Sequence, residues 1–373
     1  MSAPLIASTF AFITVQPGAE ALAKADIAAR RPELRPAFSR PGFLTFKADG
    51  EPLTPEMGSP TLFARAFGVC LGAVSVEAGE EPVQAVLSRL KALEPGGDAV
   101  LHVYRRDGEC LGEEASGEGP WTGDRVLARA FAGAPWPVNL APAEGQLVLE
   151  AIEVDPGRFW IGAHRHGAEH RATPGARPPR WSAPPEAPSR VWYKLEEALW
   201  WSGATIGPRD VVLDLGCAPG GGSWAMLRRG ARVVGVDPAE VAPEVLGEPG
   251  FEHRAIGFEA VDPASVAPET TWVVFDINLS PMLTLKHLRR LLTGLTGVHS
   301  AFVTLKMNRP QHLGKVPWML EQLQRAGFTE LRVTQLFYNR REIFVYARRP
   351  GRLPAPEPPR PPRVIPPQRP RRG

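Results

Sequence analysis

The segment that most constrains the fold of this chain is residues 211–224, where an apolar run breaks into a cluster of glycines. Val211, Val212 and Leu213 are typical of a buried parallel strand, and the sequence from Leu213 onward reads LDLGCAPGGGSW. Glycines allow the backbone to approach a ligand that a Cβ atom would keep away, and here they are Gly216, Gly220, Gly221 and Gly222. The pattern predicts a strand that leads into a ligand-binding turn and then a helix.

A second apolar strand, residues 233–236, ends in Asp237. An acid at this point of a parallel α/β sheet typically accepts hydrogen bonds from the ribose hydroxyls of a bound nucleoside. The dinucleotide pattern G-x-G-x-x-G and the phosphate-loop pattern G-x-x-x-x-G-K-[ST] are both absent from the sequence. The turn and the acid together predict a nucleoside cofactor, and the alternative is an ordinary glycine-rich turn between a strand and a helix.

The form Asp-Leu-Gly-x-x-Pro-Gly-Gly at residues 214–221 resembles the first motif of S-adenosylmethionine (SAM)-dependent methyltransferases, specifically the FtsJ-type ribose methyltransferases. Four charged residues lie at the ends of expected elements, in an order that resembles the catalytic tetrad of that family: Lys194, Asp276, Lys306 and Glu342. A lysine that ends an apolar strand is costly to bury alone, and strand carboxyl ends form the ligand crevice of open α/β sheets. We therefore expect Asp276 and Lys306 to face one pocket.

A ribose 2'-hydroxyl is a poor nucleophile at neutral pH, so its methylation needs a group that removes the hydroxyl proton. We expect Lys306 to be this base, which requires a pKa below that of a free lysine. Burial and the positive charges of Lys194 and of the SAM sulfonium favour such a shift, whereas Asp276 opposes it and orients the amine. Glu342 is expected to position Lys194.

Residues 187–190 (APSR) followed by 194–198 (KLEEA) resemble the start of the catalytic domain in the bacterial 23S rRNA (cytidine-2'-O)-ribose methyltransferase M family. That family has an N-terminal RNA-binding region that contains a THUMP part. The resemblance implies methylation of a cytidine in 23S rRNA before the ribosome is complete, with Lys306 as proton acceptor. It also implies SAM contacts from Ser189, Gly216, Ala218, Pro219, Gly220, Gly221, Asp237 and Asp276.

The chain departs from that family at two places. Gly222 stands where the family has a tryptophan directly after Pro-Gly-Gly, and Trp224 follows two residues later. Ile256 stands where the family has an acid that contacts the cofactor, just before Gly-Phe. Asp262 is the candidate to replace that acid, and the alternative is that it is only a turn residue before Pro263.

Four regions are expected along the chain: an α+β RNA-binding region with a ferredoxin-like, THUMP-type fold (1–165), a hinge (166–188), an α/β Rossmann-like methyltransferase domain (189–349) and a disordered Pro/Arg-rich tail (350–373). In the first region we expect strands over 10–15, 42–46, 69–76 and 99–104, helices over 19–31 and 83–93, and a strand pair over 147–161. In the methyltransferase domain we expect strands over 211–214, 232–237, 272–276 and 301–306, helices over 193–201, 223–229, 282–292 and 316–326, and a closing antiparallel hairpin over 328–337 and 342–347.

Composition supports a two-domain enzyme of a reducing compartment. The 373 residues are 43% hydrophobic, enough for real cores, and no apolar run is long enough to span a bilayer. The N-terminus does not resemble a signal peptide, and the three cysteines (Cys70, Cys110 and Cys217) are too few for a disulfide framework, so a cytoplasmic location is expected. His164, His166 and His170 lack a partner in register for a metal site and are expected to be solvated or to face RNA.

The net charge of +3 hides arginine-rich stretches around residues 164–190, 286–290 and 340–349, which could hold phosphates. These stretches favour an RNA substrate over a small molecule. Two other functions remain open: the same chemistry on tRNA or another RNA, and a non-catalytic RNA-binding or assembly protein with this fold. The second is disfavoured because a binding protein does not need a lysine at a strand end facing an acid.

Overall fold

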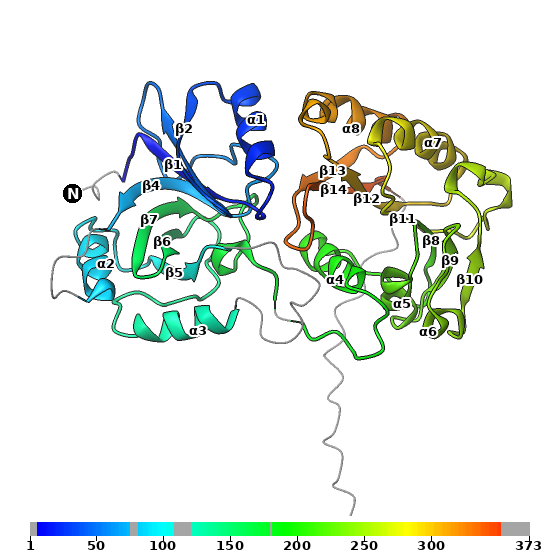
Figure 1. Ribbon diagram of the computed structural model, residues 1–373, viewed down its shortest axis with the longest axis horizontal. Coiled ribbons are helices and arrows are strands. Elements are labelled where there is room, and N and C mark those ends of the chain that lie inside the picture. The colour runs from blue at the N-terminus through cyan, green and yellow to red at the C-terminus, as the bar shows by residue number, and fades with distance from the viewer. Residues whose placement is uncertain (1–5, 75–80, 108–120, 180, 352–373) are drawn as a thin grey trace, which may run out of the picture.

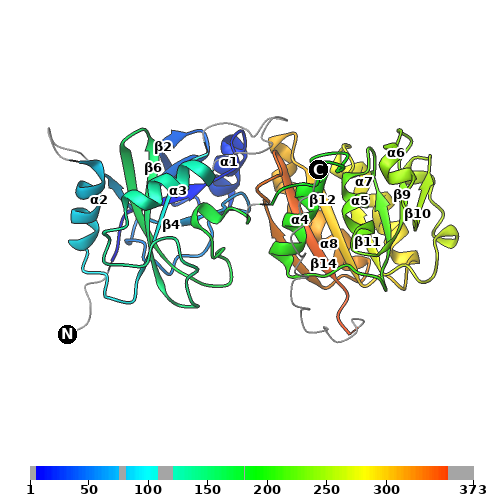
Figure 2. The same cartoon turned by 90° about the horizontal axis from the view of Figure 1, so that it is seen from below.

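The computed structural model describes residues 6–74, 81–107, 121–179 and 181–351, and its strands form two seven-stranded sheets, one in each half of the chain (Figure 1). Cys110 and the expected disordered tail beyond residue 351 lie outside these ranges. The two halves lie side by side in both ribbon views (Figure 2). The predicted fold class is confirmed: an α+β N-terminal half followed by a Rossmann-like C-terminal half.

The N-terminal sheet has the strand order β2-β3-β1-β4-β7-β6-β5, and its only parallel pair in the described ranges is β5 with β6. Its elements are β1 (Phe10–Thr14), α1 (Glu20–Arg30), β2 (Leu34–Arg40), β3 (Phe43–Ala48), β4 (Phe67–Ala73), α2 (Pro82–Lys91), β5 (Val100–Arg105), α3 (Trp121–Ala130), β6 (Leu147–Asp155) and β7 (Arg158–Arg165). The sequence pattern missed β2, an exposed edge strand whose proline and arginines hide any alternation. It also missed α3.

The C-terminal sheet has the order β10-β9-β8-β11-β12-β14-β13, parallel from β10 to β12 and antiparallel at β14 and β13. Its strands are β8 (Val211–Leu215), β9 (Arg232–Val236), β10 (Phe251–Arg254), β11 (Trp272–Phe275), β12 (Ser300–Lys306), β13 (Glu330–Thr334) and β14 (Glu342–Arg348). Its helices are α4 (Val191–Ser202), α5 (Gly221–Leu227), α6 (Pro243–Leu246), α7 (Pro281–Gly294) and α8 (Val316–Arg325). The closing hairpin was predicted, although β13 is shorter than expected, whereas β10 was missed because this edge strand reads FEHR.

Alternating side chains of the C-terminal strands pack against helices on the two faces of the sheet. Leu213 and Leu215 of β8 join the core cluster that includes α7 and α8, whereas Val212 joins the cluster that includes α4 and α5. Both faces are therefore covered, as the uninterrupted apolar sequence of β8 predicts. No helix within the described ranges has the length and apolar character that crossing a membrane requires.

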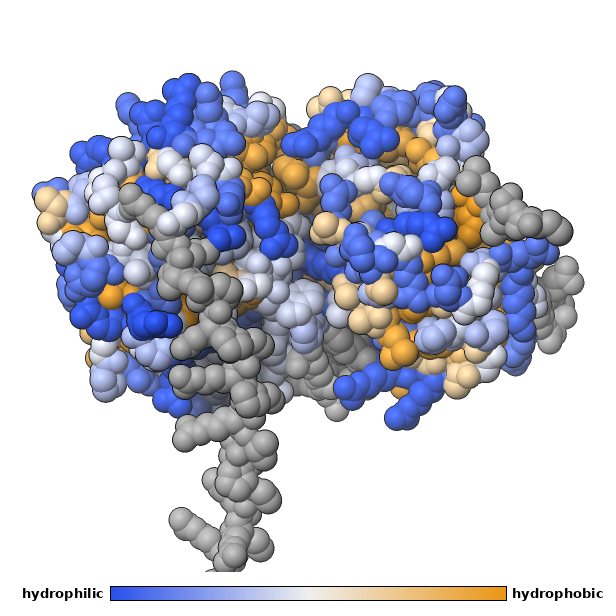
Figure 3. Space-filling model, turned by 180° about the vertical axis from the view of Figure 1, so that it is seen from behind, coloured by the Kyte–Doolittle hydropathy of each residue, from blue (hydrophilic) through white to orange (hydrophobic). Residues whose placement is uncertain are grey.

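The two halves are in direct contact. Side chains of α1 share an apolar cluster with α7 and α8, and α1 lies against the 3-10 helix η4 (Pro310–Lys315). Apolar residues gather along the seam between the halves in the space-filling view (Figure 3). The chain crosses this seam through residues 166–188, where Arg171 and Arg177 are largely buried. The segment expected to be a hinge thus carries buried cationic side chains.

Candidate active site

The structure brings together the four charged residues that the sequence pattern singled out, which we call the tetrad. The Lys306 amine donates to Asp276 Oδ1 and to Glu342 Oε1, each at 2.7 Å. The Lys194 amine donates to the other oxygens of the same carboxylates, at 3.2 Å to Asp276 Oδ2 and 3.0 Å to Glu342 Oε2. Each carboxylate bridges both amines, so the tetrad is a closed ring of two cations and two anions. Glu342 contacts both lysines, not only Lys194 as expected.

Strand topology explains why residues so far apart in sequence meet. Asp276 follows β11 and Lys306 ends β12, and the carboxyl ends of these parallel strands lie at one edge of the sheet. Since β14 runs antiparallel to β12, its first residue lies at the same edge, where Glu342 pairs in register with Lys306. Lys194 reaches this edge from α4. The antiparallel hairpin is therefore what completes the tetrad.

The electrostatics of the ring differ from the sequence-based expectation. Burial lowers the pKa of Lys306, but Asp276 and Glu342 outweigh this effect and raise the pKa above its usual value. Burial likewise raises the pKa of Asp276, and the two lysine amines outweigh it and lower the pKa. The expected depressed pKa of Lys306 is therefore wrong where only the protein's own groups act on the amine. The expectation weighed one opposing carboxylate, and the structure places two against the amine.

The glycine turn packs directly on the tetrad. Gly216 has a φ of +88°, and a Cβ there would lie 2.8 Å from the carbonyl oxygen of Asp276. A Cβ on Gly221 would overlap Ser189, the residue expected at the start of the catalytic domain. The turn is also tied to the second strand end, because Ala218 N donates to Asp237 Oδ2 at 3.2 Å. The residues expected to bind a nucleoside and those expected to do chemistry thus share one strand edge.

Residues 187–296, which contain this turn and four strands of the sheet (β8 to β11), match the family model for FtsJ-like methyltransferases. This segment is therefore similar to FtsJ-like methyltransferases, and we call residues 189–349, which contain most of it, the FtsJ-like domain. Three relatives, each called ribosomal RNA large subunit methyltransferase M, come from Halorhodospira halophila, Xylella fastidiosa (strain M12) and Ectopseudomonas mendocina. The Halorhodospira relative is 33% identical over 177 residues, which is 46% of this chain and 50% of the relative. The Xylella relative is 34% identical over 183 residues (47% of this chain and 51% of the relative). The Ectopseudomonas relative is 34% identical over 190 residues (47% of this chain and 52% of the relative).

The chain spans about half the length of the curated relatives that it matches. The predicted resemblance to the methyltransferase M family is confirmed over that stretch, and the fold of the FtsJ-like domain implies SAM as the cofactor.

The side chains at the turn of the FtsJ-like domain fit a nucleoside with a positive sulfonium. Asp237 is half-buried, and its carboxylate accepts hydrogen bonds from Ala218 N and, at 2.9 Å, from Ala239 N. A carboxylate can accept more than two hydrogen bonds, so Asp237 can also accept from ribose hydroxyls. Behind the turn, Asp214 is buried and accepts from the Ser223 hydroxyl at 2.6 Å. Burial raises the pKa of Asp214 to about 7. Asp214, Asp237 and Asp276 surround the turn with acidic groups, which suits a cationic ligand.

The two departures from the family motif have distinct surroundings. A Cβ on Gly222 would meet its nearest atom only at 3.5 Å, on Val191, so the position has space. Ile256 is 41% exposed. Asp262 caps a 3-10 turn, since its Oδ1 accepts from Ala264 N at 3.0 Å. The carboxylate of Asp262 therefore serves the turn before Pro263, which was the alternative to a contact with the cofactor.

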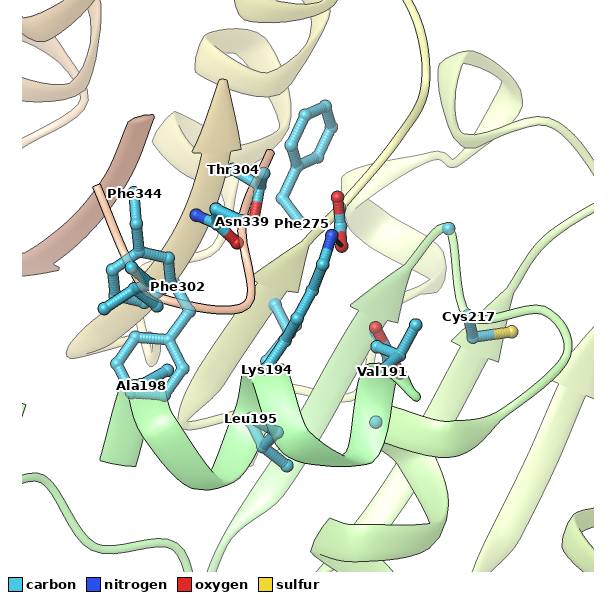
Figure 4. Close-up of a pocket in the computed structure, with 16 residues that line it drawn as sticks. Val191, Lys194, Leu195, Ala198, Cys217, Phe275, Phe302, Thr304, Asn339 and Phe344 are labelled. Atoms are coloured by element: carbon cyan, nitrogen blue, oxygen red, sulfur yellow. Dashed lines mark hydrogen bonds and ion pairs between the residues drawn. The ribbon is translucent and has the colours of Figure 1, made fainter. Parts of the chain in front are cut away.

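A cavity of the FtsJ-like domain opens beside the tetrad, between α4 and the sheet. Figure 4 shows Lys194 extending into it from α4, opposite Thr304 and Asn339. Asp214 and Asp276 also line it, together with Gly216 and Gly222 of the glycine turn, and its apolar wall includes Leu195, Ala198, Phe302, Leu336 and Phe344. Asn339 is 1% exposed, and its Nδ2 has no hydrogen-bond partner among the described residues. Such a buried donor favours an acceptor on a bound ligand or water.

Sequence reasoning missed Asn339, although it lies three residues before Glu342 in the turn of a predicted hairpin. It also missed Glu197, one helical turn beyond Lys194, which is fully buried. Asn339 belongs to no motif, and Glu197 lies in the 194–198 stretch (KLEEA), to which the family resemblance assigned no role at that position. A signal was available only for Glu197, because it falls on the apolar side of an amphipathic helix, where an acid needs a partner.

The histidine cluster lies at the end of β7 and in the segment that follows it, outside the FtsJ-like domain. His164 is 3% exposed, with Nδ1 at 3.0 Å from Glu150 Oε1, and its ring stacks on His170 at 4.2 Å between centroids. The expectation that these histidines are solvated or face RNA is wrong for His164, because it points from β7 into the core. Burial lowers its pKa to about 3, so it is neutral near pH 7.

Proposed function

We propose that this chain is a SAM-dependent RNA 2'-O-ribose methyltransferase that acts on a cytidine of 23S rRNA. The observation that carries this proposal is the position of the Lys306 amine. It lies 2.7 Å from the Asp276 carboxylate, whose own backbone packs on the glycine turn. A group that exchanges a proton is therefore next to the site expected for the methyl donor.

The chemistry divides between the cofactor and the tetrad. SAM, when bound, supplies a methyl group that its sulfonium already activates, so the protein must orient the ribose hydroxyl and remove its proton. Lys306 accepts that proton. Lys194 places a second positive charge beside the reacting oxygen, and Asp276 holds both amines in fixed orientation through its two oxygens. Ser189, Gly216, Gly220, Gly221, Pro219, Ala218 and Asp237 hold the cofactor.

Lys306 must lose its own proton before it can accept one. Asp276 and Glu342 oppose this loss in the ligand-free protein by raising the pKa of Lys306. A sulfonium charge near Asp276 would weaken that effect, because it competes with the lysines for the same carboxylate. With SAM bound, Lys194 and the sulfonium charge would both favour a neutral Lys306.

The choice of 23S rRNA rests on the similarity to the methyltransferase M relatives. We assign RNA binding to residues 1–165, the THUMP-like region, and catalysis to residues 189–349, with residues 166–188 between them. From the family resemblance, we expect the reaction to take place in the cytoplasm and before the ribosome is complete. Alternative targets are tRNA and other RNAs.

The decisive experiment combines a variant with a map of the modification. Lys306→Ala should lower methyl transfer by about 10²–10⁴-fold while SAM binding, measured by calorimetry, is retained. Ribose methylation mapped across total RNA from a deletion strain should be lost at a single cytidine of 23S rRNA. Loss at a tRNA position would identify the alternative target. Wild-type turnover by Lys306→Ala would refute the role of the lysine, and an unchanged map would refute the enzyme.

A further inference from the structure

The loop that joins β13 to β14, residues 335–341, is held by the N-terminal half of the chain. Gln335 N donates to Leu62 O at 3.0 Å, and Arg341 Nε donates to Gly18 O at 3.3 Å. The two ends of this loop, which we call the clamp loop, are therefore attached to the other half. The residue that follows it directly is the tetrad acid Glu342.

The middle of the clamp loop is held by a buried carboxylate on α4. Glu197 is fully buried, and its two oxygens accept from Phe337 N at 2.7 Å and Tyr338 N at 2.9 Å. Glu197 lies one helical turn beyond Lys194. The same helix thus contacts the loop through Glu197 and the residue after the loop through Lys194, which donates to Glu342.

The segment between the halves supplies the counter-charge. Arg171 Nη1 lies 3.5 Å from Glu197 Oε1, and Arg171 Nη2 donates to Gln335 O at 3.0 Å. Arg65, from the N-terminal half, places its guanidinium 4.9 Å from the ring centroid of Phe337. Two arginines from outside the FtsJ-like domain therefore touch the loop and its acid.

A buried ion pair is not an economical way to stabilise a fold, because well-packed apolar side chains of similar volume are often as good. A carboxylate that accepts two adjacent backbone N–H groups does something that apolar side chains cannot do. It fixes the path of those two peptide units. Asn339 follows Tyr338 directly, and its side-chain amide nitrogen lines the cavity without a hydrogen-bond partner among the described residues. Glu342 comes three residues after Asn339.

We propose that Glu197 is a positioning residue for the tetrad. It holds the clamp loop on α4 so that Glu342 lies between Lys194 and Lys306, and Arg171 makes this arrangement depend on the docking of the N-terminal half. The N-terminal half then helps to shape the reactive centre in addition to any contact that it makes with RNA. The catalytic part of this inference rests on the proposed function.

The test compares two neighbouring glutamates in the full chain. Glu196, the residue before Glu197, also forms an ion pair from α4, with Arg229 at 2.6 Å, but it does not touch the clamp loop. We expect Glu197→Gln to lower kcat by about 100-fold with unchanged SAM affinity, since displacements of about 1 Å have such effects. Glu196→Gln should leave kcat within about twofold of wild type, a change that amounts to under about 0.5 kcal/mol.

A second measurement does not depend on activity. The amine of Lys306, assigned by comparison with Lys306→Arg, is titrated by NMR in both glutamate variants without cofactor. Displacement of Glu342 removes one of the carboxylates that raise the pKa of Lys306, so this pKa should fall in Glu197→Gln and stay unchanged in Glu196→Gln. Arg171→Lys, which retains the positive charge, should give a smaller fall than Arg171→Met.

The outcomes separate this inference from the proposed function. If Glu197→Gln leaves the titration of Lys306 as it is in Glu196→Gln, the positioning role is refuted. An altered titration with wild-type kcat also refutes it, because the displaced acid would then have no catalytic consequence. If the wild-type chain transfers no methyl group to RNA, the proposed function fails, and the titration alone decides whether Glu197 positions the tetrad.

Discussion

Two charge clusters of this molecule each join two cations to two carboxylates, but they differ in their chemistry. The tetrad joins two lysines to two carboxylates at the edge of the C-terminal sheet. The arginine cluster joins Arg65 and Arg177 to Asp107 and Asp124 in the N-terminal half. Side chains of the tetrad are 10–24% exposed beside a cavity, whereas those of the arginine cluster are 1–12% exposed.

The difference shows that paired buried charges do not by themselves mark a reactive site. An arginine stays protonated in proteins, so the arginine cluster cannot exchange a proton, but its planar guanidinium suits fixed multiple contacts. Arg177 lies in the segment between the halves and anchors it to Asp107, at 2.8 Å. Lysines can lose their proton, and the tetrad borders a cavity that a substrate could enter. The type of cation and its access to a cavity therefore distinguish a cluster that anchors a segment from one that can react with a substrate.

The largest expected effect comes from replacing a lysine of the tetrad with arginine, the cation of the arginine cluster. Lys306→Arg keeps the positive charge beside Asp276 and Glu342 but removes the amine that we propose as the proton acceptor. Methyl transfer should fall by at least about 100-fold while the melting temperature changes little. Single-turnover transfer of labelled methyl and a thermal melt measure the two quantities. Substantial transfer by this variant would mean that positive charge alone suffices.

A stability loss without a catalytic loss is expected from the arginine cluster. Arg177→Met leaves Asp124 without its ion-pair partner in a nearly sealed site, and the free energy of unfolding should fall by about 3–5 kcal/mol. Urea denaturation measures this change. The SAM affinity of the folded fraction should match wild type. A loss below about 1 kcal/mol would show that the cluster does not anchor the segment between the halves.

The pH dependence of methyl transfer sharpens the contrast further. Asp276 and Glu342 raise the pKa of Lys306, so these ion pairs stabilise the fold below the free-lysine pKa and are lost as the pH rises through the folded-state pKa. The same rise in pH produces the neutral amine that a base requires. The value of kcat/KM should therefore rise with pH into the alkaline range. Asp276→Asn removes one opposing carboxylate and should move this rise about 1 pH unit or more toward acid. An unmoved profile would mean that another group titrates.

The smallest expected effect is from Asp124→Asn in the arginine cluster. The amide oxygen can still accept from Arg105 N, now at 2.9 Å, and Arg177 retains Asp107. The free energy of unfolding should fall by only about 1–2 kcal/mol, with methyl transfer unchanged. Parallel urea denaturation of Asp124→Asn and Arg177→Met tests this order. A larger loss in the aspartate variant would make Asp124 the main anchor.

Much of the candidate site could be predicted from the sequence because its parts are local. The turn at Gly216 and the acids Asp237 and Asp276 each follow an apolar strand, and the carboxyl ends of parallel strands must meet. Lys306 stands out because a lysine that ends a buried strand needs a partner. The hairpin that returns Glu342 to this edge was also predicted. Strand β10 was not, since an edge strand exposed to solvent needs no apolar pattern.

What the sequence determined by itself is the type of fold and the chemical character of the strand edge, because periodicity and residue type are local properties. Tertiary structure alone decided the strength and geometry of the charges there. Lys306 meets two carboxylates rather than one, so its pKa rises instead of falling. Glu197 meets the clamp loop and Arg171 across the seam between the halves. The strength of these interactions depends on the distances between side chains of segments that are far apart in the sequence. Those distances cannot be read from the spacing of residues along the chain.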